Sequence, residues 1–272
     1  MEVSRSGYYK YLQHALSKTH IPENKLLIEV KIVAQESQNS YGSRKMAKHL
    51  QMKGYSVGRY AARTLMHKAG IKCKQRRHYR ITTQSQHNFL VANNVLNREF
   101  TVSSPNRVWL ADITYLWTLE GWLYIAALLD LFSRRVIGWA MANHMRETLV
   151  NEALQTALGR RRPEQGLLHH SDRGVQYASH DYQFALKAAG ITVSMSRKGN
   201  CWDNAVMERF WGSLKSERTD GKIYHTRESA KADVINYFEM FYNCRRLHST
   251  LGYVTPMQFE KQFLLKNRST FS

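Results

Sequence analysis

Three acidic residues of this 272-residue chain stand where a carboxylate suggests chemistry. Asp112 interrupts the apolar segment VWLADITYLW (108–117), where a buried charge is costly unless it is paired or binds a metal. Asp172 ends the apolar segment GLLHHSD (166–172), and ligands bind at such strand ends in α/β sheets. Glu208 lies one turn into a predicted helix.

The residue types favour one kind of metal site. Carboxylates with no His or Cys at ligand spacing suit a hard cation such as Mg²⁺ or Mn²⁺ better than zinc. Two such ions about 3.5–4 Å apart support phosphoryl transfer, since one activates a water or 3′-hydroxyl and the other stabilises the leaving oxygen. Asp112, Asp172 and Glu208 therefore predict a two-ion catalytic site, provided that the fold gathers them.

Other assignments of the same residues were weighed against this one. Asp130 also ends a predicted strand and is an alternative to Asp112 as the first carboxylate. The run from His169 to Asp172 contains the residue types of a serine hydrolase, but the chain has no G-x-S-x-G elbow. His169 and His170 also lack partners at zinc-ligand spacing, so a core or DNA-facing histidine is the simpler interpretation.

The segments around these acids predict an α/β domain. Three β-branched and aromatic segments with short connections predict an antiparallel meander over 108–117, 123–132 and 134–141. Helices and strands then alternate: a helix over 147–161, a strand ending at Asp172, a helix closed by Gly190, a strand over 191–196 and the Glu208 helix. This order matches a ribonuclease-H-like architecture, a mixed five-stranded sheet with flanking helices.

The Glu208 helix carries a basic residue on the same side. Asp203 and Asn204 are expected to cap the first turn. Lys215 follows Glu208 by seven residues, which is close to two helical turns. We expect Glu208 to approach the sheet edge where Asp112 and Asp172 converge.

The N-terminal part of the chain predicts short helices. Pro22 starts the first, the second runs from Ser43 to Gly54, and the third runs over 59–69. The third helix should bury Tyr60 or Ala61 together with Leu65 and Met66, and direct Arg59, Arg63 and Lys68 outward. Two helices joined by a glycine-containing turn resemble a helix-turn-helix, although an ordinary helical hairpin fits equally well.

These patterns suggest four regions. Residues 1–71 form a helical, helix-turn-helix-like DNA-binding region, and 72–104 form a basic linker that begins with KCKQRRHYR. Residues 105–220 form the catalytic core, and 221–272 form a C-terminal helix and tail that complete it.

Charge and composition narrow the partners and the compartment. The formal net charge is +19, and most of the excess lies in the first 90 residues, which favours binding to a polyanion such as nucleic acid. Three widely spaced cysteines without a CxxC pair argue against a disulfide framework and fit a reducing cytoplasm. The apolar run over 122–129 is too short to span a bilayer, and no secretion signal begins the chain, so no membrane partner is expected.

Four sequence blocks carry a family resemblance. They are WLADITYLWTLEGWLYIAALLDLFSRRVIGWAM, HHSDRGVQYAS, SMSRKGNCWDNAVMERFWGSLKSE and YNCRRLHSTLGYVTPMQF. They resemble the signature blocks of bacterial insertion-sequence transposases of the IS-three family (OrfB product), whose core is similar to that of retroviral integrases. The 35 residues between Asp172 and Glu208 match the family's D,D(35)E spacing. Residues 41–71 resemble its upstream helix-turn-helix.

The resemblance implies a role for each motif residue. It implies that Asp112, Asp172 and Glu208, in preference to Asp130, hold two Mg²⁺ ions, for which Mn²⁺ can substitute. It also implies a DNA-contacting set, to which the predicted helix-turn-helix adds two arginines: Lys215, Arg173, Lys198, Asn204, Arg59 and Arg63. The implied reaction is cleavage and strand transfer at insertion-sequence ends by a 3′-hydroxyl, with no covalent protein–DNA intermediate.

The resemblance also implies partners. DNA ends and target DNA are the substrates, and the synapsis of two ends implies a homo-oligomer during the reaction. Many such elements fuse this product to an upstream-frame protein, and members usually carry residues before VSRSGYY, so this chain is expected to start late or to be a fragment. A bacterial, nucleoid-associated cytoplasmic location follows. The alternative function is a non-catalytic DNA-binding partner or regulator of the fused transposase.

Overall fold

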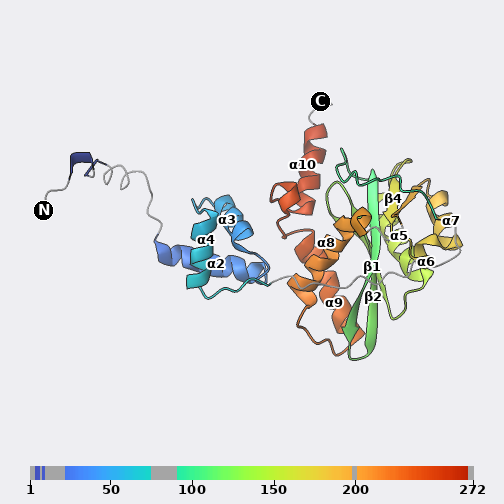
Figure 1. Ribbon diagram of the computed structural model, residues 1–272, viewed down its shortest axis with the longest axis horizontal. Helices are drawn as coiled ribbons and strands as arrows, with labels where there is room; N and C mark the ends of the chain where they lie inside the picture. Colours follow the sequence, from blue (N-terminus) through green and yellow to red (C-terminus); the bar gives the residue numbers. More distant parts are fainter. Residues whose placement is uncertain (1–3, 7, 10–21, 75–90, 198–200, 269–272) are drawn as a thin grey trace. The chain divides into compact units, whose positions relative to one another are not determined.

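The computed structural model describes residues 4–6, 8–9, 22–74, 91–197 and 201–268 (Figure 1). The chain divides into two compact units, Met1–Cys73 and Lys74–Ser272. None of the helices in the described ranges has the length and apolar character needed to cross a bilayer. The predicted region boundaries stay a prediction.

Within residues 22–74 of the described chain, the helices are α2 (Glu23–Glu36), α3 (Ser43–Met52) and α4 (Arg59–Lys68). They pack on one another around Val30, Val33, Met46, Leu50 and Leu65, which are all buried. One detail of the sequence prediction was wrong, because Tyr60 and Ala61 are exposed and Ala62 is buried in their place. Ala62, Leu65 and Met66 share one helical face at spacings of three and four residues.

A mixed sheet forms the centre of the second unit. Its strands are β1 (Val108–Thr118), β2 (Gly121–Asp130), β3 (Val136–Ala142), β4 (Leu168–Ser171) and β5 (Thr192–Met195). The order is β3-β2-β1-β4-β5, with β1, β2 and β3 antiparallel and β1, β4 and β5 parallel. This is the ribonuclease-H-like arrangement, and the predicted fold class is confirmed.

Helices cover both faces of the sheet (Figure 1). On one face lie α5 (Glu147–Arg161), α6 (Val175–Ala178) and α7 (His180–Ala188). Their apolar side chains pack on Trp109, Ala111 and Leu128. On the other face lie α8 (Ala205–Leu214) and α9 (Arg227–Asn236). A 3₁₀ turn, Cys201–Asn204, precedes α8, and a π-helical turn, Lys215–Thr219, follows it.

The C-terminal part closes over the edge strand β3. A second π-helical turn, Tyr237–Tyr242, continues α9. Beyond it, the side chain of Asn243 pairs with the backbone N–H and carbonyl of Val136 at 2.9 and 3.0 Å. A 3₁₀ turn, Ser249–Leu251, then leads to α10 (Pro256–Arg268). Asn243 thus pairs with the first residue of the edge strand, whose outward backbone groups would otherwise have no strand partner there.

Substitution of Gly138, on β3, tests the contact between the sheet and α5. A Cβ added there would lie 2.5 Å from the Ala153 carbonyl oxygen and 2.6 Å from the Ala157 Cβ. Gly138→Ala should therefore lower the free energy of unfolding by about 3 kcal/mol, because the helix must move away from the strand. Gly159→Ala, with open space around its added methyl, should raise it by about 0.5–1 kcal/mol. Urea unfolding of both variants checks the pair, and equal effects would contradict this packing.

Candidate active site

The register of two parallel strands aligns Asp112 with Asp172. β1 and β4 pair Val108 with Leu168 and Leu110 with His170. Continuing this register by two residues places Asp172 level with Asp112. Side chains two residues apart share a face of a sheet. The neighbouring strands therefore present the two carboxylates at the same height on the same face.

Each aspartate is oriented by a local backbone bond. The Ile113 N–H donates to Asp112 Oδ1 at 2.9 Å, and the Gly174 N–H donates to Asp172 Oδ1 at 2.8 Å. Gly174 also leaves room for this carboxylate, since a Cβ there would lie 3.0 Å from Asp172 Oδ1. The close approach of the Asp172 carboxylate therefore explains why the DRG motif has a glycine at position 174.

The electrostatics of Asp112 set it apart from an ordinary surface acid. Burial raises the pKa of its carboxyl well above the usual value, and the nearby charge of Asp172 raises it further. The Ile113 N–H and the Trp211 indole lower that pKa by smaller amounts, and Glu208 adds a small increase. The Trp211 indole N–H itself makes no hydrogen bond with the described residues. Burial and the second carboxylate therefore dominate the electrostatics of Asp112.

Helix α8 brings the third predicted acid within electrostatic range of the aspartates. It packs on β1 through a face that includes Met207, Phe210, Trp211 and Leu214, all of which are buried. Glu208, Trp211 and Lys215 follow at spacings of three and four residues, so they form a line along the helix. The influence of Glu208 on the Asp112 pKa shows that this line runs beside the aspartate pair.

The three acids do not form a closed metal cage. Within the part of the chain that the structure describes, no group of three His, Cys, Asp or Glu side chains is close enough together to hold one ion. The donor set nevertheless fits a hard divalent cation, because Asp112 and Asp172 are hard oxygen ligands that repel each other in a partly buried place. Glu208 lies within electrostatic range and would complete the ligands by moving inward.

Lys215 lies at the far end of this line. Its ammonium nitrogen sits 5.2 Å from the centre of the Tyr115 ring. Burial lowers its pKa, while Tyr115, Asp220 and Asp112 oppose that shift. Lys215 therefore connects the aspartate pair with the aromatic side chains of β1.

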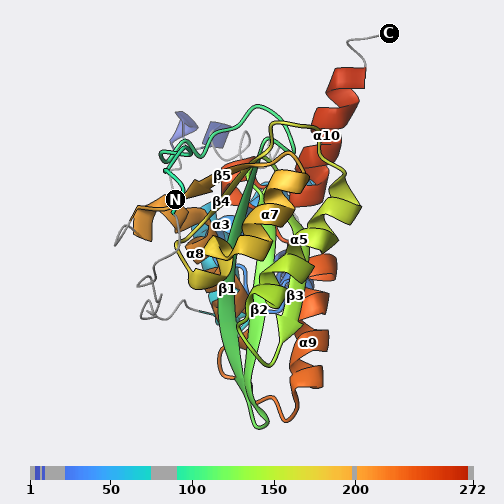
Figure 2. The same ribbon diagram turned by 90° about the vertical axis from the view of Figure 1, so that its right-hand side faces the viewer.

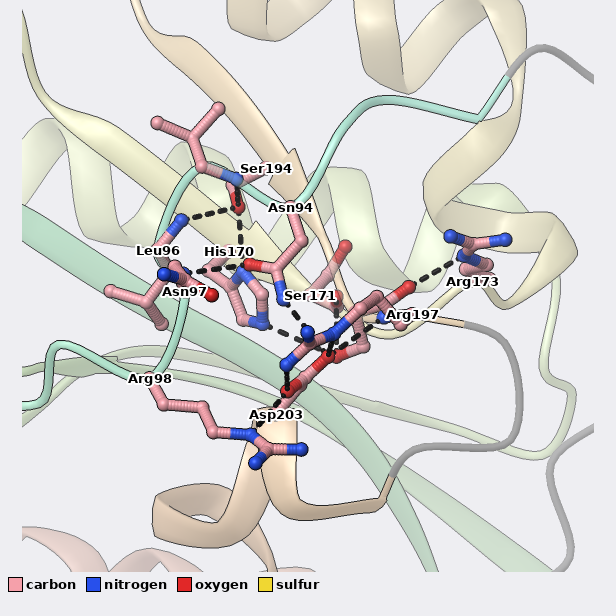
Figure 3. Close-up of polar contacts among 12 residues, drawn as sticks. Asn94, Leu96, Asn97, Arg98, His170, Ser171, Arg173, Ser194, Arg197 and Asp203 are labelled. Atoms are coloured by element: carbon pink, nitrogen blue, oxygen red, sulfur yellow. Dashed lines mark hydrogen bonds and ion pairs between the residues drawn. The ribbon is translucent and has the colours of Figure 1, made fainter.

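Asp203 holds the N-terminal end of α8 by contacts that differ from the expected cap (Figure 3). Its buried carboxylate accepts hydrogen bonds from Arg197, Arg98 and Asn94 at 2.9–3.0 Å. These bonds, chiefly that of Arg197, hold its pKa well below the usual range. Asn204 occupies the N-cap position but makes no capping hydrogen bond. The prediction that these two side chains cap α8 was wrong, because two arginines bind the stronger acceptor.

The same cluster ties residues before the sheet to β4 and β5. Ser194 Oγ accepts from the backbone N–H groups of Val95 and Leu96 at 3.0 and 3.1 Å. It also lies 2.8 Å from His170 Nδ1. Burial lowers the pKa of His170 to about 4, so this ring is neutral at pH 7 and serves as a hydrogen-bonding spacer.

His169 and Asp130, the alternative site residues suggested by the sequence, both make contacts that stabilise the fold. His169 is fully buried, lies 2.9 Å from the Tyr182 hydroxyl, and has its pKa lowered to about 3 by burial. Asp130 is fully buried, and its carboxylate accepts from the Asn106 N–H and from the N–H and hydroxyl of Ser133, each at 2.8 Å. These bonds close the turn after β2, which supports a structural role for Asp130.

The predicted DNA-contacting residues fall in different places. Lys215 lies beside the acids, and Arg173 lies next to Asp172 with its Nε donating to the Ser196 carbonyl at 2.5 Å. Asn204 is buried, and its side-chain oxygen has no hydrogen-bond partner among the described residues. Lys198 lies outside the described residues. Arg59 and Arg63 are exposed on α4, in the other unit.

Sequence reasoning missed the Arg98–Asp203–Arg197 cluster and the position of Trp211. Both depend on contacts between segments that are far apart along the chain, such as the 105 positions between Arg98 and Asp203. The signal available in the sequence was the acid in CWDN next to the basic SRK segment. That pattern alone does not distinguish an ion pair from a helix cap.

Comparison with known proteins gives consistent matches. Two family models described as integrase core domain match residues 102–201 and 189–256, and one described as HTH-like domain matches 22–79. The 31 kDa protein of insertion element IS600 from Shigella sonnei is 42% identical over 96% of this chain and 96% of its own length. The transposase InsF for insertion sequence IS3A of Escherichia coli is 38% identical over 97% and 92%.

Among solved structures, the HTLV-2 integrase catalytic core domain in complex with magnesium is similar to this chain. It is 16% identical and aligns with a TM-score of 0.43 over 58% of this chain and 97% of its own.

Replacing Asp112 should stabilise the protein while it removes the metal site. Because the folded pKa of Asp112 is raised above the ordinary value near 3.8, ionisation opposes folding, and the loss of stability grows as pH rises past that value. In EDTA at pH 8, Asp112→Asn should therefore raise the free energy of unfolding by about 1–3 kcal/mol. The gain should shrink as pH falls toward 4.

Thermal unfolding with and without Mg²⁺ checks this prediction. Magnesium should raise the melting temperature of the parent chain and leave that of Asp112→Asn unchanged. Glu228→Gln is the control, since that side chain is 84% exposed. A destabilised Asp112→Asn variant, or an equal Mg²⁺ response in both proteins, would show that this carboxylate is an ordinary structural acid.

Proposed function

The chain belongs to the family of insertion-sequence transposases that includes InsF of IS3, and from this membership we propose that it cuts and joins DNA strands at the ends of its element. The proposed reaction is a metal-dependent attack of a 3′-hydroxyl on a phosphodiester, as in a DDE-type polynucleotidyl transferase. The observation that carries this proposal is the level placement of Asp112 and Asp172 on adjacent parallel strands.

The proposed metal ligands are Asp112, Asp172 and Glu208. Two Mg²⁺ ions bound there, or Mn²⁺ in their place, would activate the attacking hydroxyl and stabilise the leaving oxygen. The chain's own contribution is to hold the aspartates at one height and to set Glu208 within electrostatic range of them on α8. Lys215 and Arg173 are proposed to bind phosphates on either side of the reacting bond.

No covalent protein–DNA intermediate is part of this proposal. Tyr177 is a buried tyrosine that interacts electrostatically with Asp112 and Asp172, and burial raises the pKa of its hydroxyl well above the usual value. Such a phenol is a poor nucleophile because its anion is disfavoured. The 3′-hydroxyl of the DNA is the nucleophile in its place.

The N-terminal unit is proposed to bind DNA by a helix-turn-helix. Arg59 and Arg63 are exposed on α4, the second helix of the pair formed with α3. The four proposed regions are residues 1–71, 72–104, 105–220 and 221–272. We further propose that two copies act together during synapsis, that an upstream-frame protein contributes to the active form, and that the protein works at DNA in the bacterial cytoplasm.

Substitution of each proposed ligand tests the reaction. Asp112→Asn, Asp172→Asn and Glu208→Gln should each reduce Mg²⁺-dependent strand transfer on DNA carrying the element's ends by about three orders of magnitude, since each removes a charged ligand of the reacting ions. Glu228→Gln should retain the activity of the parent. A triad variant that joins DNA at close to the parent rate would refute this assignment. A parent chain that binds the ends and never joins them would support the regulator.

The role of α4 is tested separately by the salt dependence of DNA binding. Arg59→Ala combined with Arg63→Ala should weaken binding and reduce the slope of log K against log salt by about two, because two phosphate contacts are lost. Thr64→Ala is a matched control, since Thr64 is exposed on the same helix and carries no charge. Affinity and slope equal to those of Thr64→Ala would mean that these arginines do not contact DNA.

A further inference from the structure

The β1–β2 hairpin extends beyond the rest of the sheet (Figure 2). β4 pairs with β1 only along 108–110, whereas β2 accompanies β1 to Thr118. At about 3.3 Å per residue, the hairpin tip lies roughly 20 Å along the strand from Asp112. The proposed active site therefore lies at the base of a protruding two-stranded ribbon.

Three aromatic side chains share one face of this ribbon. Trp117 pairs with Trp122 across the strands, and Tyr115 stands two residues from Trp117 on the same face. Asp112 lies an odd number of residues from both, so its side chain points to the opposite face of the ribbon. Lys215, which interacts with Tyr115 and with Asp112, links the two faces. The ring of Trp122 lies 5.0 Å from that of Tyr115 and 4.8 Å from that of Trp117, both edge-on. Tyr115, Trp117 and Trp122 remain 36%, 54% and 43% exposed. We call these three residues the aromatic face.

The turn below the aromatic face is held rigidly. Thr118 Oγ1 donates to the Gly121 carbonyl at 2.7 Å. Arg227, at the start of α9, donates from Nε to the Trp122 carbonyl at 3.0 Å and from its backbone N–H to Glu120 at 2.7 Å. Gly121 has a φ of +103°, and a Cβ there would lie 2.9 Å from Arg227 Nη2. The aromatic face thus rests on a fixed support, so its exposure is not the result of a loose loop.

Charge decides which occupant suits this surface. Lys215 sits 5.2 Å from the Tyr115 ring centre and also interacts with the Asp112 carboxyl. Flat rings next to a cation are the pattern that binds unpaired bases along a phosphate backbone. The protein is also strongly basic, with a formal net charge of +19.

We propose that Tyr115, Trp117 and Trp122 stack unpaired bases of the DNA strand that enters the Asp112–Asp172 site, with Lys215 binding the intervening phosphate. This inference rests on the proposed function, since it takes DNA as the substrate at that site. It adds a preference for ends that are locally single-stranded. Stacking contacts the flat surface that every base has, so the aromatic face would bind unpaired DNA without a sequence preference.

The test compares two DNA ends in the full-length chain. Trp117→Ala should weaken binding of a duplex with an unpaired tail by about tenfold and leave binding of the blunt duplex unchanged, since stacking on one ring is lost. Trp117→Phe should restore most of the affinity because it keeps a ring. Leu119→Ala is the matched control, with a 61% exposed aliphatic side chain in the same turn. Binding is measured in EDTA, so the result does not depend on strand transfer.

Several outcomes would overturn the proposal. Equal affinity of Trp117→Ala and Leu119→Ala for tailed DNA would do so, and so would a loss from Trp117→Ala that Trp117→Phe fails to restore. If Trp117→Ala converts a dimer into a monomer in light scattering with tailed-DNA affinity unchanged, the aromatic face is a contact between copies. Strand transfer on tailed ends separates the two proposals. Loss of joining in Asp112→Asn with normal binding by Trp117→Ala would retain the proposed function and reject base stacking.

Discussion

Electrostatic repulsion between two carboxylates on adjacent parallel strands is the constraint on which this site depends. The β1–β4 pairing fixes Asp112 and Asp172 at one height, and burial together with the neighbouring charge raises the pKa of Asp112. A protein that needed only stability would replace one of these acids or supply an arginine. Elsewhere in this chain, the buried acids Asp203 and Glu217 are paired with arginines. The unfavourable pair is therefore best understood as a ligand set that becomes favourable when a cation binds.

The contrast with Asp203 supports this interpretation, because the two aspartates differ only in their surroundings. Asp203 is fully buried and receives Arg197, Arg98 and Asn94, so its pKa is lowered. Glu217 is buried likewise and forms a two-point ion pair with Arg246, both contacts at 2.7 Å. The carboxylates of Asp203 and Glu217 therefore stabilise the fold, and arginines balance their negative charge. Burial first, and the neighbouring Asp172 second, raise the pKa of Asp112, and a carboxyl pKa raised in this way is typical of functional sites.

Much of the core could be predicted from the sequence because its signals are local. The strand segments around Asp112 and Asp172 are continuous apolar runs bounded by turns, and their order implied the sheet. The spacing of Glu208 and Lys215 likewise put them on one side of a helix. The anchoring of α8 could not be predicted, since Asp203 and Arg98 meet only in the folded chain. The two π-helical turns were also missed, because a period of 3.6 fits those segments equally well. Residue spacing also cannot predict how far Glu208 lies from the two aspartates. In the described chain the three acids do not form a closed group of metal ligands.

Anchors at both ends of α8 have a consequence for how DNA would lie in the site. Asp203 fixes the start of the helix, and Glu217, in the π-helical turn after it, fixes the end through Arg246. A helix held at both ends keeps Glu208 and Lys215 about two turns, roughly 10 Å, apart along one line. Glu208 then stands at the end of the line near the aspartates, and Lys215 stands at the end that touches Tyr115. Within the proposed function, a strand whose reacting phosphate is at the acids would extend along α8 toward the aromatic face, because Lys215 supplies a cation at that end of the line.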